Sequence, residues 1–136
     1  MGFRIKQPDS AFSLDRIHHR IKDEAHLALV RQLPSMISGE FGCDPAHVNF
    51  AVPSIGKSHR GKSQRADDCF VLPLTRALHR SQHKTGLEQD WWARHGIDNP
   101  SEIALRLYSY SKQKLSEAER ISICSEFIET INRRAF

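Results

Sequence analysis

The sequence predicts an α+β fold in which a two-stranded antiparallel sheet leads into a helix, with further α-helices flanking this unit. Three observations favour it. Apolar and polar residues alternate over 46–52, as in a half-buried strand. A short apolar run at 69–74 is typical of a buried strand, and the helical segment that follows it carries two histidines four residues apart.

The composition indicates one soluble domain. The chain has 136 residues, enough to bury a core without disulfides, and its formal charge of +4 with a pI near 9.2 favours a polyanionic partner. Cys43, Cys69 and Cys124 form an odd set without a close pair, so we expect a reducing, cytoplasmic location. No apolar run approaches the roughly 20 residues of a bilayer span, so we expect no membrane partner.

The N-terminal third is expected to be mostly helical. Residues 1–12 look like a flexible arm. Helical spacing of apolar residues then begins at Ser13 and continues to Leu33, either as one long helix or as two with a break near Asp23. Pro34 should end this region, and residues 35–46 should form a loop with tight turns.

The first predicted strand carries a histidine on its open face. Val48, Phe50 and Val52 should point into the core, which sends His47 and the intervening residues to the other side until Pro53 stops the strand. The second predicted strand, 69–74, is apolar throughout and should be buried.

Between the two strands lies a polar, basic segment. It contains glycines and four cations before the first acidic residue, and these are Lys57, Arg60, Lys62 and Arg65. Such a segment is either a solvated linker or a loop that binds phosphate groups through charge.

A helix from Thr75 to about Lys84 carries His79 and His83. Residues at i and i+4 share one helix face with Cβ atoms about 5–6 Å apart, so both rings can reach one metal ion. The alternative is an ordinary polar helix face. His47 on the preceding strand favours the metal site, because such a site needs converging groups.

Three more helices are expected. The first spans Leu87 to His95 and buries Trp91 and Trp92, and the next starts at Asn99-Pro100. A capping box at 116–119 opens the last helix, whose apolar stripe packs on the domain or on a second copy of the chain. The stripe comprises Ile121, Cys124, Phe127, Ile128 and Ile131.

The order of these parts resembles a phage and prophage branch of the HNH endonucleases, also called His-Me finger or ββα-metal nucleases. The likeness covers about residues 27–108, within an expected nuclease domain of 13–111 followed by the C-terminal helix at 112–136. Its motifs are Leu33-Pro34, Cys43-Asp-Pro-Ala-His47, Val71-Leu-Pro-Leu74, His79-x-x-x-His83 and Trp91-Trp92-x-x-x-Gly96-Ile-Asp98.

The resemblance implies roles for individual residues. His47 matches the general base that activates the attacking water, and His79 and His83 match the ligands of one divalent metal ion, which could be Mg, Mn, Ni or Zn. The asparagine that gives these nucleases their middle letter would align near Phe70 and is missing. Asp68 is therefore expected either to orient His47 or help the metal, or to act only as a turn residue.

One departure concerns a second, structural zinc that such relatives commonly bind through two Cys-x-x-Cys pairs. The corresponding positions are Ser35, Ser38, Thr75 and Leu78. None supplies a thiolate, so we expect the structural zinc to be absent.

Together these features lead to the hypothesis of a metal-dependent endonuclease that hydrolyses DNA phosphodiester bonds and is encoded by a phage or prophage. The alternatives are an HNH-fold DNA-binding protein with reduced catalysis and an interaction protein that forms a homodimer through its last helix.

Overall fold

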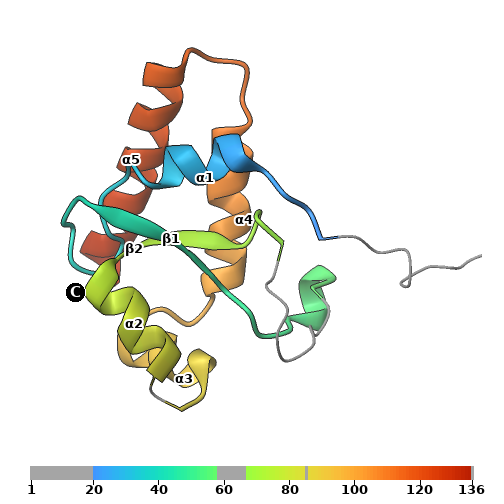
Figure 1. Ribbon diagram of the computed structural model, residues 1–136, viewed down its shortest axis with the longest axis vertical. Coiled ribbons are helices and arrows are strands. Elements are labelled where there is room, and N and C mark those ends of the chain that lie inside the picture. The colour runs from blue at the N-terminus through green and yellow to red at the C-terminus, as the bar shows by residue number, and fades with distance from the viewer. Residues whose placement is uncertain (1–19, 58–66, 85, 136) are drawn as a thin grey trace, which may run out of the picture.

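A two-stranded antiparallel sheet lies at the centre of the computed structural model, which describes residues 20–57, 67–84 and 86–135 (Figure 1). The predicted arm at 1–12 and the first part of the predicted helical segment, 13–19, lie outside these residues. Of the rest of that segment, residues 20–23 are not helical and the helix ends at Val30, before Leu33 and Pro34. The described helices are α1 (Glu24–Val30), η3 (Pro53–Ile55, a short 3-10 helix), α2 (Arg76–Lys84), α3 (Glu88–Arg94), α4 (Pro100–Ser111) and α5 (Glu117–Ala135), and the strands are β1 (Cys43–His47) and β2 (Val71–Thr75). The predicted α+β class is confirmed.

The register of the sheet places Pro45 opposite Pro73 and His47 opposite Val71. Each strand of a two-stranded sheet has an unpaired edge, where a residue without an N–H is tolerated. Our prediction for the first strand was therefore wrong in position: it treated Pro45 as part of a loop and began the strand near His47, whereas β1 ends at His47.

The sheet leads directly into α2, as the sequence predicts. Thr75 is the last residue of β2, and its Oγ1 accepts a hydrogen bond from the Leu78 N–H at 3.4 Å, which satisfies a donor in the first turn of the helix. Gly86 follows α2 with φ of +64°, a conformation that favours glycine. The unit β1–β2–α2 thus has the predicted ββα order.

The hydrophobic core lies between this unit and the surrounding helices. Trp91 and Trp92 of α3 are 1% and 0% exposed, with ring centroids 5.1 Å apart in an edge-to-face arrangement, so the prediction that both tryptophans pack in the core is confirmed. Leu72 and Leu74 of β2 and Leu107 of α4 are also fully buried in the same core.

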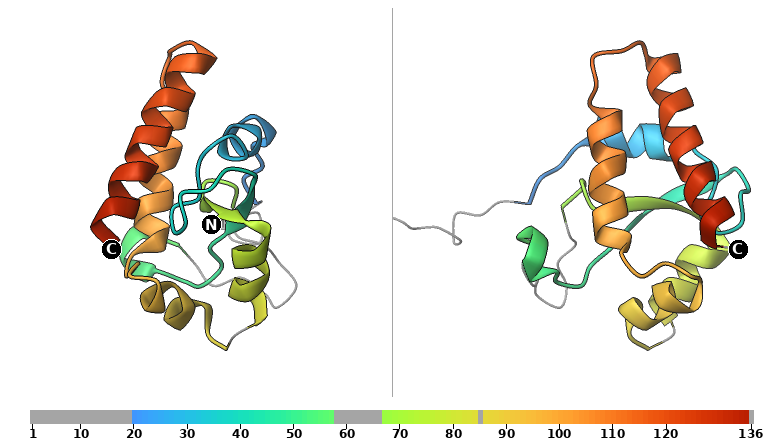
Figure 2. Two further views of the ribbon diagram at one scale, coloured as in Figure 1. Left: turned by 90° about the vertical axis from the view of Figure 1, so that its left-hand side faces the viewer. Right: turned by 180° about the vertical axis from the view of Figure 1, so that it is seen from behind.

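Helix α5 packs against α4, and the two run side by side in both views of Figure 2. The predicted capping box is present, since Ser116 N–H donates to Glu119 Oε1 at 3.0 Å and Glu119 N–H to Ser116 Oγ at 3.2 Å. Cys124 and Ile128 are fully buried in the core. At the far end, Asn132 Nδ2 donates to the Met36 and Ile37 carbonyls at 3.0 and 2.8 Å. The apolar stripe of α5 therefore packs on its own chain.

Helix α1 begins where the sequence places a possible break. Asp23 is its N-cap and accepts a hydrogen bond from the His26 N–H at 3.0 Å through Oδ1. Asp23 Oδ2 accepts from Tyr108 Oη at 2.9 Å and Lys112 Nζ at 2.6 Å, both on the α4 side. Burial would raise the pKa of Asp23, but these hydrogen bonds lower it to about 2.

The imidazole of His26 is buried at the same junction. It is 1% exposed, and its Nδ1 lies 2.8 Å from Ser111 Oγ. Burial lowers the pKa of His26 from 6.5 to about 4, because the charged form would lose its hydration.

We predict that acid destabilises this protein through His26. In the unfolded chain the imidazole of His26 binds a proton near pH 6.5, and in the folded chain only near pH 4. The stability that the folded state owes to the neutral imidazole is therefore complete above pH 6.5 and is lost as the pH falls towards 4. Between pH 7.5 and 4.5 the free energy of unfolding should fall by about 2–3 kcal/mol through this group.

Urea denaturation at the two pH values measures this loss. His26→Gln should remove most of the pH dependence, whereas His83→Gln at an exposed position should retain it. Equal pH dependence in wild type and His26→Gln would exclude the assignment.

Candidate functional site

His47 lies at the end of β1 and pairs with Asp68, as one of the two roles predicted for Asp68 requires. The His47 Nε2 and Asp68 Oδ1 atoms are 2.8 Å apart, and the two side chains are 11% and 2% exposed. Asp68 lies in the turn that precedes β2, whose residue Val71 is the partner of His47 in the sheet. The pairing of the strands therefore brings the imidazole to the carboxylate.

The Asp68 carboxylate also holds the segment before α1. Its Oδ1 accepts a hydrogen bond from Arg20 Nη1 at 2.9 Å, and its Oδ2 accepts from the Asp23 N–H at 2.8 Å. Burial would raise the pKa of Asp68, but the hydrogen bonds from His47 and Asp23 and the charges of His47 and Arg20 keep it below its ordinary value. Asp68 is therefore ionised at neutral pH.

This ionisation fixes the proton arrangement of His47. A carboxylate is only an acceptor, so the His47 Nε2 must carry the hydrogen in their shared bond. A neutral imidazole then has its lone pair on Nδ1. The second ring nitrogen of His47 is thus the atom that can accept a proton.

The main chain of His47 is held by a second network that the sequence did not reveal. Its carbonyl accepts hydrogen bonds from Asn49 Nδ2 and from Gln82 Nε2, each at 3.2 Å. Glu88 of α3 accepts in turn from Gln82 Nε2 at 2.9 Å, from the Asn49 N–H at 3.2 Å and from Trp92 Nε1 at 3.1 Å. Both α2 and α3 therefore fix the end of β1.

His79 and His83 share one face of α2, as predicted, with ring centroids 4.9 Å apart. Asp44 of β1 lies beside them, and its Oδ2 is 3.2 Å from His79 Nδ1. The pKa of Asp44 is lowered: burial opposes this, but the hydrogen bonds and charges of His79 and Arg76 outweigh it. His79 can therefore donate from Nδ1 and keep its Nε2 for a ligand.

The three histidines that we expect at one metal ion, His47, His79 and His83, make different local contacts. Within the described residues, no group of three or more His, Cys, Asp or Glu side chains is arranged to hold a metal ion. The structure pairs His47 with Asp68, and His79 with His83 and Asp44. The donors present near α2 are thus two imidazoles with one carboxylate behind them.

The four positions at which the resemblance to HNH nucleases predicts lost zinc ligands make local side-chain contacts. Ser35 Oγ accepts from the Ile37 and Ser38 N–H groups at 3.2 Å each, and Ser38 Oγ accepts from the Glu40 N–H at 3.4 Å. Thr75 satisfies the first turn of α2 in the same way. Side-chain oxygens at three of the four positions stabilise the loop and the start of the helix.

Lys57, which the sequence predicts to bind nucleic acid, is 5% exposed. Its ammonium group donates to the Phe50 carbonyl and lies 5.3 and 5.0 Å from the ring centroids of Phe50 and Phe70. This burial supports a structural role for Lys57 in the 52–57 turn. A buried ammonium group is not available to contact nucleic acid. Arg60, Lys62 and Arg65 lie outside the described residues.

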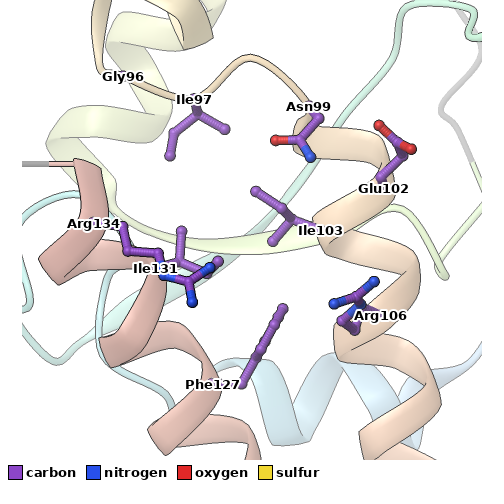
Figure 3. Close-up of a pocket in the computed structure, with 9 residues that line it drawn as sticks. All are labelled: Gly96, Ile97, Asn99, Glu102, Ile103, Arg106, Phe127, Ile131 and Arg134. Carbon is purple, nitrogen blue, oxygen red and sulfur yellow. The ribbon is translucent and has the colours of Figure 1, made fainter.

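A separate pocket of about 320 Å³ lies between α4, α5 and the segment after α3 (Figure 3). Ile97, Ile103 and Phe127 point into it, and Arg106 and Arg134 lie at its sides. None of the predicted site residues lines this pocket. No helix in the described part of the chain has both the length and the apolar character that crossing a membrane requires.

We predict that Asp68→Asn destabilises the fold strongly. The amide cannot balance the charge of Arg20 and leaves buried donors poorly paired, which should cost about 2–4 kcal/mol. Asp98→Asn, at an exposed position, should change the free energy of unfolding by less than about 0.5 kcal/mol. Chemical denaturation at pH 7 tests both, and equal small effects would contradict a central role for Asp68.

The comparisons with known proteins give one match. No curated protein and no solved structure matches this chain. The family model described as "Protein of unknown function (DUF968)" matches residues 6–111. That range includes the ββα unit and every residue of the candidate site described above, so the chain belongs to the DUF968 family.

Proposed function

We propose that this protein is a metal-dependent endonuclease of the HNH type that hydrolyses phosphodiester bonds in DNA. The observation that carries the proposal is the His47–Asp68 pair, in which a buried carboxylate holds an imidazole at the end of a strand at 2.8 Å. A catalytic base needs such an orienting group on its second nitrogen. The resemblance to phage and prophage HNH nucleases supports the same assignment.

In this proposal His47 is the general base. Its Nδ1 takes a proton from the water that attacks the scissile phosphorus, while Asp68 keeps the imidazole in the required tautomer and stabilises the imidazolium that forms. The hydrogen bonds from Asn49 and Gln82 to the His47 carbonyl limit movement of the residue. Glu88 supports both of them.

His79 and His83 would hold one divalent ion. Two adjacent imidazoles fit Mn, Ni or Zn better than Mg, which prefers oxygen ligands. Asp44 accepts a hydrogen bond from His79 Nδ1. A carboxylate in this position orients a histidine ligand and makes its other ring nitrogen more basic. A bound ion would supply positive charge to neutralise the phosphate and stabilise the leaving oxygen.

The alternative is a DNA-binding protein that keeps the fold without cleavage. Its basis is the replacement of the cysteines that hold a structural zinc in HNH nucleases of this kind by Ser35, Ser38, Thr75 and Leu78. In either case Arg60, Lys62 and Arg65 remain proposed phosphate contacts, and phage or prophage origin remains part of the proposal.

We predict that the protein nicks supercoiled plasmid in Mg²⁺ or Mn²⁺ and that His47→Ala lowers the rate at least 100-fold, because general-base catalysis typically contributes that much. Gel electrophoresis of the plasmid measures nicking, and the nicking should stop in EDTA. His95→Gln, a change at the C-cap of α3, is the matched control and should retain activity.

Binding of DNA by wild type without any nicking would favour the non-catalytic alternative. Nicking that survives in His47→Ala would instead reject His47 as the base.

We also predict that the protein binds Mn²⁺ or Zn²⁺ through α2. In titration calorimetry, His79→Ala with His83→Ala should abolish the binding, and Asp44→Asn should weaken it about 10–100-fold, the usual effect of removing a carboxylate behind a histidine ligand. His95→Gln should leave the affinity unchanged. Unchanged affinity in the double variant would place the ion elsewhere.

A further inference from the structure

The outward face of α2 carries three positive charges in a row. Arg76, Arg80 and Lys84 occupy positions i, i+4 and i+8, which lie on one face of a helix, and all three residues are exposed. With 1.5 Å of rise per residue, their Cα atoms span about 12 Å along the axis. His79 and His83 are on the adjoining face at the same spacing.

These charges lack strong partners in the described structure. Arg80 and Lys84 make no hydrogen bond or ion pair with any described residue, and Arg76 has a long contact of 3.5 Å to Asp44 while its side chain is 72% exposed. The sequence of α2 contains no Asp or Glu. The face is therefore a basic stripe in which Arg76 has a described acidic partner, Asp44, and Arg80 and Lys84 have none among the described residues.

Helix stability does not explain the stripe. Like charges four residues apart destabilise a helix, and Arg76 in the first turn opposes the helix dipole. Packing does not explain it either, because α2 contacts β1, β2 and α3 through its other side, where Gln82 is 3% exposed and Leu78 packs against the core. Figure 1 shows α2 at the edge of the molecule.

We propose that this stripe, formed by Arg76, Arg80 and Lys84, binds the phosphate backbone of duplex DNA and holds the strand beside His79 and His83. The proposal rests on the nuclease function above and names the surface that contacts the substrate. Three exposed cations with no carboxylate on their own helix complement a polymer that carries a negative charge about every 1.7 Å along its axis. The stripe adds a contact surface on described residues to the loop expected from the sequence.

The test compares two triple variants with equal loss of charge. One is Arg76→Gln, Arg80→Gln and Lys84→Gln. The control is Arg31→Gln, Arg106→Gln and Lys114→Gln, which are exposed positions on or after α1 and α4. Binding of a short fluorescent DNA duplex is measured by anisotropy in EDTA between about 50 and 200 mM salt, the range over which phosphate contacts weaken strongly.

Each lost phosphate contact lowers the slope of log K against log salt by about 0.9, so the stripe variant should lose about 2.7 in slope. Raising the salt from about 50 to 200 mM weakens binding in both proteins. The factor by which the affinity of wild type decreases should be about 40 times the factor for the stripe variant. The control should keep most of the wild-type slope, since its three cations lie away from the stripe. Circular dichroism on both variants checks that α2 remains folded.

Equal slopes in the two triple variants would overturn the stripe as the contact surface. If wild type nicks DNA while the stripe variant binds like the control, the nuclease function stands and only the surface is rejected. If wild type neither binds nor nicks DNA, both proposals fail together.

Discussion

One buried carboxylate determines much of this structure. Asp68 is ionised in a position that is 2% exposed, and such a group is tolerated only when hydrogen bonds and opposite charges surround it. Its partners come from the segment before α1 and from the end of β1. The requirement to satisfy this charge therefore joins distant parts of the chain, and it determines the orientation of the imidazole that we assign to catalysis.

The sequence predicted those parts of the molecule that depend on local patterns. The order of strand, strand and helix, the shared face of His79 and His83, and the capping box at Ser116 follow from periodicity and short-range hydrogen bonding. The position of β1 did not follow, because the local signal of Pro45 suggests a turn while a two-stranded sheet accepts it.

The supporting residues of the candidate site are partners across long stretches of chain. Asp44 meets His79 at a separation of 35 residues, and Glu88 meets Asn49 at 39. The local sequence pattern does not identify these carboxylates. The pairing of β1 with β2 brings Asp44 beside α2, and the packing of α3 on α2 brings Glu88 to Asn49. For Lys57 the local pattern was misleading. In the sequence it belongs to a basic run that suggests an exposed cation, but in the structure its side chain is buried beside Phe50 and Phe70.

The relation between the family and the core has a practical consequence. The DUF968 match ends at residue 111, the last residue of α4, yet Cys124 and Ile128 of α5 are fully buried against the preceding helices. A fragment cut at the edge of the match would leave the apolar side of α4 open to solvent and prone to aggregation. Recombinant fragments of this protein should therefore extend through Asn132, whose side chain donates hydrogen bonds to the loop after α1.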